Sequence, residues 1–256
     1  MIDGRIKGLP ASRLHARRDE VTHGFDVTLS RMRPAVFVVV ALLYASSVAA
    51  QPAPRRVEGT VDRWEKDIAA FEAADKMSPP QKGGIVFVGS STIRRWDTAL
   101  YFPDLKIINR GFGGSDMVDA VRYVDRIVIP YEPRLVVVYS GDNDISAGWT
   151  SEDVAIQFER FTRAVHAKLP QTRILLIAVK PSLLRWTQID RMRMANTMMR
   201  AYCERDDRLA FIDFDTLMLG WDEKPRRELF VEDGLHLTAQ GYQLWSTVLR
   251  PWLTAP

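Results

Sequence analysis

The stretch Leu135-Val-Val-Val-Tyr-Ser-Gly-Asp-Asn-Asp144 indicates the fold class of this 256-residue chain. Its first half is apolar throughout, which is typical of a strand that helices cover on both faces, as in a parallel sheet. Its second half turns polar where that strand would end. Four other short runs are also rich in apolar, branched residues, so we expect five strands, at residues 85–88, 106–109, 135–139, 173–178 and 209–213.

Helical patterns separate the expected strands. Apolar residues three or four apart follow Thr150 and stop at Pro170, and Thr150 with Asp153 three residues later is typical of a helix start. Similar stripes lie at residues 61–71 and 242–249. A further stripe consists of Val118, Val121, Val124 and Val128. Strands that alternate with helices predict an α/β fold, with a parallel sheet between two layers of helices.

The first 50 residues resemble a targeting sequence. Residues 34–50 are uncharged, apolar and end in small residues, and Arg31 and Arg33 precede them, which is the layout of a secretory signal peptide. The run is shorter than the roughly 20 apolar residues of a membrane span. We therefore expect a signal peptide at residues 32–50, cleaved after about Ala50, and export to the periplasm or the medium, with an uncleaved anchor as the alternative. Residues 1–31 would be a start-site artefact ahead of Met32, or a disordered leader.

The remaining residues are expected to form one domain, residues 84–256, with a helix and linker at 51–83 packed on it. Residues 1–50 hold 7 of the 35 basic and 4 of the 32 acidic residues, so the other 206 residues carry 28 of each. This balance removes the main support for a nucleic-acid partner. The one cysteine, Cys203, excludes a disulfide within the chain, and its helical surroundings predict burial.

Polar motifs follow the expected strands, and ligands of parallel sheets collect at the carboxyl ends of strands. The first motif is Gly89-Ser90-Ser91, whose small residues allow a sharp turn that aims one serine into the crevice. It is not the Gly-x-Ser-x-Gly elbow of the α/β-hydrolases, because position 93 is Ile. Taken alone, the motif is as compatible with an ordinary loop as with a nucleophile.

The second motif is the glycine-rich run from Asn109 to Ser115. Its glycines permit backbone conformations that turn N–H groups toward an anion. A dinucleotide fingerprint would need glycine at position 116, where this chain has Asp, so that interpretation fails. A plain glycine-rich turn remains the alternative.

The third motif is Gly141-Asp142-Asn143-Asp144. The Asn143 amide could donate a hydrogen bond to developing negative charge, as side chains of oxyanion holes do. An Asx-type turn is the alternative. A calcium loop built on the two aspartates is disfavoured, because Ala147 stands where such a loop needs glycine. We expect no metal site.

The fourth motif, Asp233-Gly-Leu-His236, places a carboxylate three residues before a histidine. A serine hydrolase needs such a pair to activate its nucleophile. Of the other histidines, His15 and His23 fall in the leader, and His166 falls in what reads as the polar face of a surface helix. A histidine base would therefore be His236. The alternative is a turn capped by Asp233.

Together the four motifs resemble the blocks of the SGNH or GDSL-type hydrolases, a family named for a Ser, a Gly, an Asn and a His. The resemblance covers about residues 84–250. The matching residues are Ser91, Gly114, Asn143, Asp233 and His236. Ser90 replaces the aspartate of the family's name motif, which leaves Ser90 as a rival candidate for the nucleophile. The resemblance implies a three-layer α/β/α sandwich with a five-stranded parallel sheet, similar to flavodoxin.

The resemblance also implies an acyl-enzyme mechanism. Ser91 would attack an ester carbonyl, His236 would take its proton and return it to the leaving alcohol, and Asp233 would orient the imidazole. The N–H groups of Ser91 and Gly114 and the Asn143 amide would form the oxyanion hole. No cofactor is implied.

The expected substrate is a small-molecule, glycan or lipid ester, such as a short-chain ester, a lysophospholipid or an acetylated carbohydrate. Four aromatic residues near the motifs are candidates for a substrate pocket: Trp96, Phe112, Trp149 and Trp186. Residues 180–182 are candidates for its rim. Two alternatives stay open, namely an acyltransferase that acts on sugar hydroxyls and a non-catalytic carbohydrate-binding module of the same fold.

Overall fold

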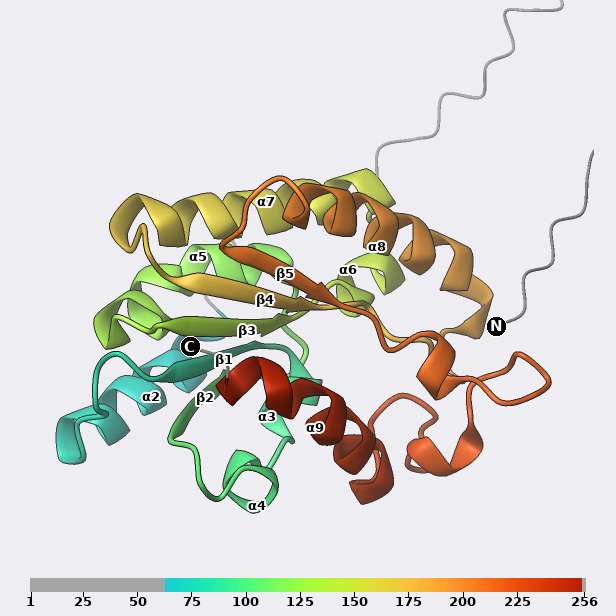
Figure 1. Cartoon of the computed structure of the whole chain (residues 1–256), viewed down its shortest axis with the longest axis horizontal. Helices are drawn as coiled ribbons and strands as arrows, with labels where there is room; N and C mark the ends of the chain where they lie inside the picture. The colour runs from blue at the N-terminus through green and yellow to red at the C-terminus, as the bar shows by residue number, and fades with distance from the viewer. Residues whose placement is uncertain (1–62, 255–256) are drawn as a thin grey trace, which may run out of the picture. The chain divides into compact units, whose positions relative to one another are not determined.

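The structure is a computed structural model, and it describes residues 63–254. The expected leader and signal peptide lie outside the described residues. The described part has three layers, with a central sheet between two layers of helices (Figure 1).

All five strands of the sheet are parallel. Their bounds are β1 (Ile85–Gly89), β2 (Ile107–Gly111), β3 (Leu135–Tyr139), β4 (Arg173–Ile177) and β5 (Leu209–Ile212). Their order is β2-β1-β3-β4-β5, as in flavodoxin, which confirms the predicted fold. The winding direction changes between β1 and β3, and Gly89 at the end of β1 lies opposite Gly111 of β2 and Tyr139 of β3. Ligands bind at such a switch point.

The helices of the described part follow or precede the strands. The α-helices are α2 (Glu65–Met77), α3 (Ser91–Arg94), α4 (Thr98–Tyr101), α5 (Met117–Ile127), α6 (Asp142–Ser146), α7 (Ser151–Lys168), α8 (Ile189–Cys203) and α9 (Ala239–Thr254). Short 3-10 turns are η1 (Ile129–Tyr131), η2 (Trp186–Gln188), η3 (Thr216–Met218) and η4 (Arg227–Leu229).

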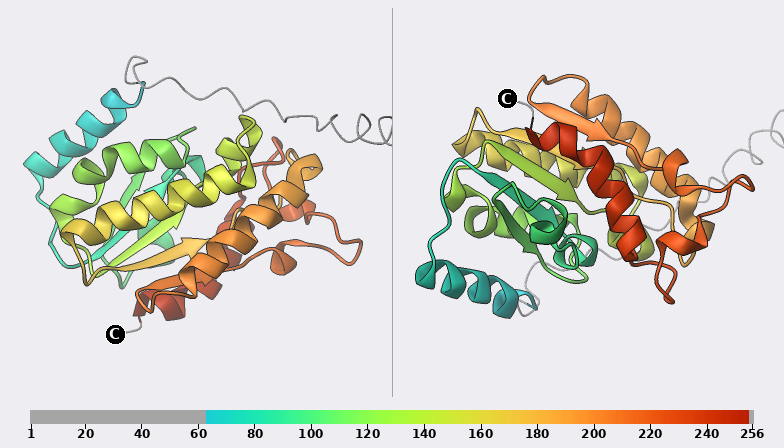
Figure 2. Two further views of the ribbon diagram at one scale, coloured as in Figure 1. Left: turned by 90° about the horizontal axis from the view of Figure 1, so that it is seen from above. Right: turned by 60° about the horizontal axis from the view of Figure 1, so that its bottom comes forward.

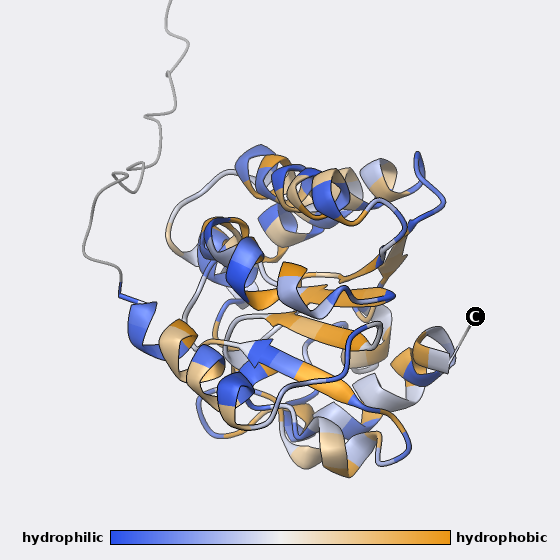
Figure 3. Cartoon of the chain, turned by 90° about the vertical axis from the view of Figure 1, so that its left-hand side faces the viewer, coloured by the Kyte–Doolittle hydropathy of each residue, from blue (hydrophilic) through white to orange (hydrophobic). Residues whose placement is uncertain are grey.

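Strand side chains alternate between two hydrophobic cores. Val86 and Val88 of β1 face the core under α5, α7 and α8, whereas Phe87 faces the core under α9 (Figures 1 and 2). Figure 3 shows the hydrophobic strands between helices that turn polar residues outward. Each fully buried Val or Phe contributes roughly 1.5–3 kcal/mol. Burial on both faces explains why the strands read as unbroken apolar runs.

The C-terminal helix α9 holds the segment that follows β1. Trp245 of α9 is fully buried and stacks on Phe214 with the ring centroids 4.7 Å apart. The Tyr242 hydroxyl donates to the carbonyl of Thr92 at 2.8 Å, and the Trp96 indole donates to Ser246 Oγ at 3.1 Å. Two hydrogen bonds therefore tie α9 to residues 92–96, next to the first polar motif.

The helix start predicted at Thr150 is confirmed, because Thr150 and Asp153 form a capping box at the first turn of α7. The valine stripe of α5 is partly wrong. Val118 and Val121 are only half-buried. The buried face of α5 instead consists of Met117, Asp119, Ala120, Tyr123, Val124 and Ile127. The valines form an apolar pattern, but the helix is rotated so that the aromatic ring of Tyr123 enters the core.

Among residues 63–254, no helix is both long and apolar enough to cross a membrane.

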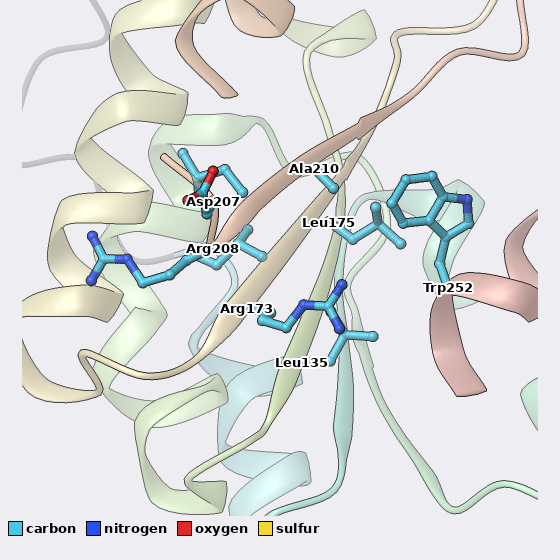
Figure 4. A pocket seen from close by; sticks show the side chains of 9 residues that line it. Leu135, Arg173, Leu175, Asp207, Arg208, Ala210 and Trp252 are labelled. Atoms are coloured by element: carbon cyan, nitrogen blue, oxygen red, sulfur yellow. The ribbon is translucent and has the colours of Figure 1, made fainter. Parts of the chain in front are cut away.

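At the amino ends of β3, β4 and β5, a cavity of about 10 Å³ lies between Leu135, Arg173 and Trp252 (Figure 4). This cavity has room for about one water molecule, so it is no substrate site.

Candidate active site

The turn after β1 places Ser91 at the first position of α3. Gly89 has a φ of 152°, and a Cβ on it would lie 1.9 Å from the Tyr139 carbonyl oxygen, so only glycine fits this position. The two serines then point to different surroundings: Ser90 is 1% exposed, whereas Ser91 lines an open pocket. The rival nucleophile Ser90 is therefore buried away from the pocket.

Ser91, His236 and Asp233 form a continuous chain of contacts. His236 Nε2 lies 2.8 Å from Ser91 Oγ, and His236 Nδ1 lies 2.6 Å from Asp233 Oδ2. The carboxylate on Nδ1 favours the tautomer with its proton there, which leaves Nε2 free to accept the serine proton. The structure thus brings together the three side chains that the fourth and first motifs supplied.

Asp233 is held ionised by its own loop. Partial burial opposes ionisation, but hydrogen bonds from the His236 ring and from the backbone N–H groups of His236 and Leu235 outweigh it, and the pKa of the carboxyl lies well below its usual range. A carboxylate that stays charged at neutral pH can stabilise an imidazolium. Asp233 therefore suits the orienting position of a triad.

The predicted oxyanion residues border the same pocket as Ser91. The pocket has a volume of about 620 Å³, and its lining residues are Ser91, Arg94, Arg95, Gly113, Gly114, Asn143, Leu235 and His236. Gly114 adopts a φ of 79°, which a residue with a side chain would resist. The Asn143 amide nitrogen donates to the Ser115 carbonyl at 2.8 Å and keeps a second N–H available.

A buried ionic cluster holds the side-chain oxygen of Asn143 and so sets the orientation of its amide. Arg185 Nη2 donates to Asn143 Oδ1 at 2.8 Å, and Arg185 Nη1 lies 3.0 Å from Asp142 Oδ2. Lys180 Nζ donates to Tyr139 Oη at 3.0 Å and to Asp142 Oδ2 at 3.3 Å. With its oxygen held by Arg185, the amide must present its nitrogen as the donor.

The Lys180 position corrects the prediction that residues 180–182 form a rim. Lys180 is 1% exposed and Ser182 is 2% exposed, so both lie inside the protein.

Burial lowers the pKa of the Lys180 ammonium. Burial also opposes ionisation of Asp142, yet the neighbouring charges of Lys180 and Arg185 leave the pKa of Asp142 below its usual range.

Asp144 connects the third motif to the start of α5. Its Oδ1 accepts the N–H of Met117 at 2.9 Å. Complete burial is the largest cause that raises the pKa of Asp144 to about 7, and the negative charge of Asp116 is the next.

Within the described residues no cluster of His, Cys, Asp and Glu side chains is placed to hold a metal ion.

The candidate aromatic pocket is wrong for two of its members. Trp96 and Phe112 are 2% and 0% exposed, and each packs against other aromatic rings in a core. Trp96 fills the core under α9, and Phe112 fills the core under α5, α7 and α8. Trp149 and Trp186 are half-buried and do not line the pocket over Ser91.

The sequence interpretation missed two kinds of site residue. Arg94 and Arg95 line the pocket, and their place three and four residues after Ser91 was the available signal. Arg185 lies 42 positions from Asn143, and no local pattern joins them.

A serine, a histidine and an aspartate in this arrangement, at the carboxyl edge of a flavodoxin-like sheet, meet the requirements of a serine hydrolase. The model of the GDSL-like lipase/acylhydrolase family matches residues 91–244, and the chain belongs to that family of ester-hydrolysing enzymes. No curated protein matches the chain.

Solved structures share the fold. A protein from Streptococcus pneumonia has a TM-score of 0.67 at 20% identity, covering 74% of this chain and 92% of its own. A GDSL-like lipase from Bacteroides thetaiotaomicron has a TM-score of 0.63 at 19% identity, covering 73% and 98%. A variant of a Geobacillus acetyl-xylooligosaccharide esterase has a TM-score of 0.54 at 14% identity, covering 69% and 96%. Such low identities establish a common fold and no more.

Proposed function

We propose that this protein is an exported serine esterase that hydrolyses carboxylic esters through an acyl-enzyme. The observation that carries the proposal is the contact chain from Asp233 through His236 to Ser91, which opens into the pocket bordered by Asn143. Each link is within hydrogen-bond distance, as nucleophile activation requires.

In the first half of the reaction, Ser91 Oγ bonds to the ester carbonyl carbon while its proton passes to His236 Nε2. The carbonyl oxygen gains negative charge, and we assign its stabilisation to the N–H groups of Ser91 and Gly114 and to the Asn143 amide. Collapse of this intermediate breaks the ester bond, and the imidazolium gives its proton to the leaving alcohol. In the second half, water attacks the acyl-enzyme by the same proton transfers and releases the acid.

The proposed substrates are short-chain, lysophospholipid or acetylated-carbohydrate esters. An acetyl-xylooligosaccharide esterase and an acetyl esterase among the proteins of this fold support the acetylated-carbohydrate choice.

Export rests on the sequence of residues 32–50, which lie outside the described residues. It is tested by mass spectrometry of the N-terminus of the mature protein, which we expect to be Gln51.

The activity is tested with para-nitrophenyl esters of increasing acyl length. Ser91→Ala should lower turnover by on the order of 10⁶, and Asn143→Ala by about 10²–10³. The matched control is Ser90→Ala, which removes a neighbouring hydroxyl and should keep most of the rate.

Two outcomes would change the proposal. Loss of turnover in the Ser90 variant but not in the Ser91 variant would reassign the nucleophile. Turnover on no ester would favour the non-catalytic binding module, whereas transfer of the acyl group to added sugars in preference to water would favour an acyltransferase.

A further inference from the structure

The charges that line the pocket beside Ser91 all have one sign. Arg94 and Arg95 belong to the lining, and among the described residues no Asp or Glu does. Asp233, which follows His236 in the contact chain from Ser91, is engaged by His236 at 2.6 Å. The pocket therefore offers cationic groups and N–H donors to whatever enters it.

Both arginines are available to a ligand. The Arg94 side chain is 59% exposed, and its one ion pair in the described residues, with Asp67, spans 3.9 Å. The Arg95 side chain is also exposed, and within residues 63–254 no carboxylate lies within ion-pair distance of it. By contrast, Arg126 holds Glu72 at 2.6 Å and Arg250 holds Asp104 at 2.9 Å.

Arg94 lies close to the reacting atoms. A side-chain carbon added at Gly113 would be 3.1 Å from Arg94 Nη1 and 4.0 Å from Ser91 Cβ, so these two atoms are no more than about 7 Å apart. A reacting carbonyl carbon sits about 3 Å from the nucleophile. An anionic group only a few bonds from the ester carbonyl can therefore reach the guanidinium.

We propose that the pocket selects esters that carry an anionic group, a carboxylate or a phosphate, which Arg94 and Arg95 bind while Ser91 attacks the ester carbonyl. This inference rests on the proposed esterase function. The planar guanidinium donates paired hydrogen bonds that match both anions. Two exposed cations also attract an anionic substrate before it docks.

The experiment compares three acetyl esters of similar size. Methyl para-acetoxybenzoate is neutral, para-acetoxybenzoate carries a carboxylate, and para-acetoxyphenyl phosphate carries a phosphate. Each kcat/KM is divided by the rate of alkaline hydrolysis of the same ester, which removes differences in intrinsic reactivity. The readout is the ratio of anionic to neutral ester, from which the active fraction of the enzyme cancels.

We expect the wild-type ratio to be about tenfold at low salt, since each exposed ion pair contributes up to about fivefold, and to fall as salt is added. The double variant Arg94→Gln/Arg95→Gln should bring the ratio close to one, and Arg94→Lys alone should retain part of it. The control Arg163→Gln removes an exposed charge on α7 and should leave the ratio unchanged.

The relative rates of the two anionic esters then identify the preferred anion. A wild-type ratio near one would overturn the inference, and so would a preference that survives in the double variant. Absence of turnover on all three esters in the wild type would instead overturn the proposed esterase function, so the two failures are distinguishable.

Discussion

Replacing Lys180 with Met tests the ionic cluster behind Asn143. Lys180 is fully buried, and its Nζ lies 3.3 Å from Asp142 Oδ2. Removing one partner of a buried pair leaves an uncompensated charge and costs about 3–5 kcal/mol. Because Arg185 still faces Asp142 at 3.0 Å, we take the lower end, about 3 kcal/mol. For a domain of this size that corresponds to a fall in Tm of roughly 6–12 °C.

The matched control is Lys82→Met. Lys82 is closer to its partner, with Nζ 2.6 Å from Glu132 Oε1, but the side chains are 62% and 56% exposed. Solvent screening limits such a pair to about 1 kcal/mol or less. Burial and not distance should therefore decide the ranking.

The assay is urea unfolding of both variants, with equal m-values required for comparison. The pKa of Asp142 is depressed in the folded protein, so the stabilisation from its charged form is present above the unfolded value near 4 and is lost below it. The deficit of the Lys180 variant should accordingly shrink as the pH falls below about 4. A deficit below 1 kcal/mol at pH 7, or one no larger than that of the Lys82 variant, would refute the reasoning.

Three further predictions concern the loops around the site. Gly111→Ala places a Cβ 2.2 Å from the backbone of α3 and should destabilise the fold by about 3 kcal/mol in urea unfolding. The control Gly84→Ala, whose Cβ has no neighbour closer than 3.6 Å, should leave the stability unchanged. Equal stabilities of the two variants would contradict this prediction. Folded Asp144, with its pKa raised to about 7, keeps a proton that the unfolded chain releases near pH 4. Stability should therefore fall with rising pH between these values by up to roughly 1.4 kcal/mol per unit, and Asp144→Asn should flatten that slope in urea titrations at several pH values; an unchanged slope would assign it to other groups. Arg185→Lys keeps the positive charge but loses the guanidinium group that holds the Asn143 side-chain oxygen. The kcat should therefore fall about tenfold with KM little changed. A change in KM alone would argue against a role of Arg185 in orienting the Asn143 amide.

The sequence predicted the sheet well because its strands are buried on both faces. Each expected strand overlaps the observed one, and β3 matches at both ends. The rotation of α5 was not predictable, because its valines and its buried Tyr123 form two overlapping apolar stripes. Only the packing against neighbouring helices decides between them.

The place of Ser91 directly after β1 follows from the rule that ligands bind at the carboxyl ends of parallel strands, whereas the contact of His236 with Ser91 rests on its place just before α9. The residues around them do not follow from local pattern. Arg185 and Lys180 act on Asn143 and Asp142 across about 40 positions of chain. Trp96 and Phe112 show the opposite error, since closeness to a motif in sequence did not place their rings in the pocket.

The separation of Ser91 and His236 along the chain has a consequence for the synthesis of the protein. The two side chains touch at 2.8 Å but are 145 positions apart, and α9, which ties down the segment after Ser91, comes later still. A growing chain presents its N-terminal portion first. In the proposed mechanism, Ser91 therefore has no base to activate it throughout most of translation. Under the proposed mechanism, esterase activity would therefore arise only late in synthesis, once His236 lies beside Ser91.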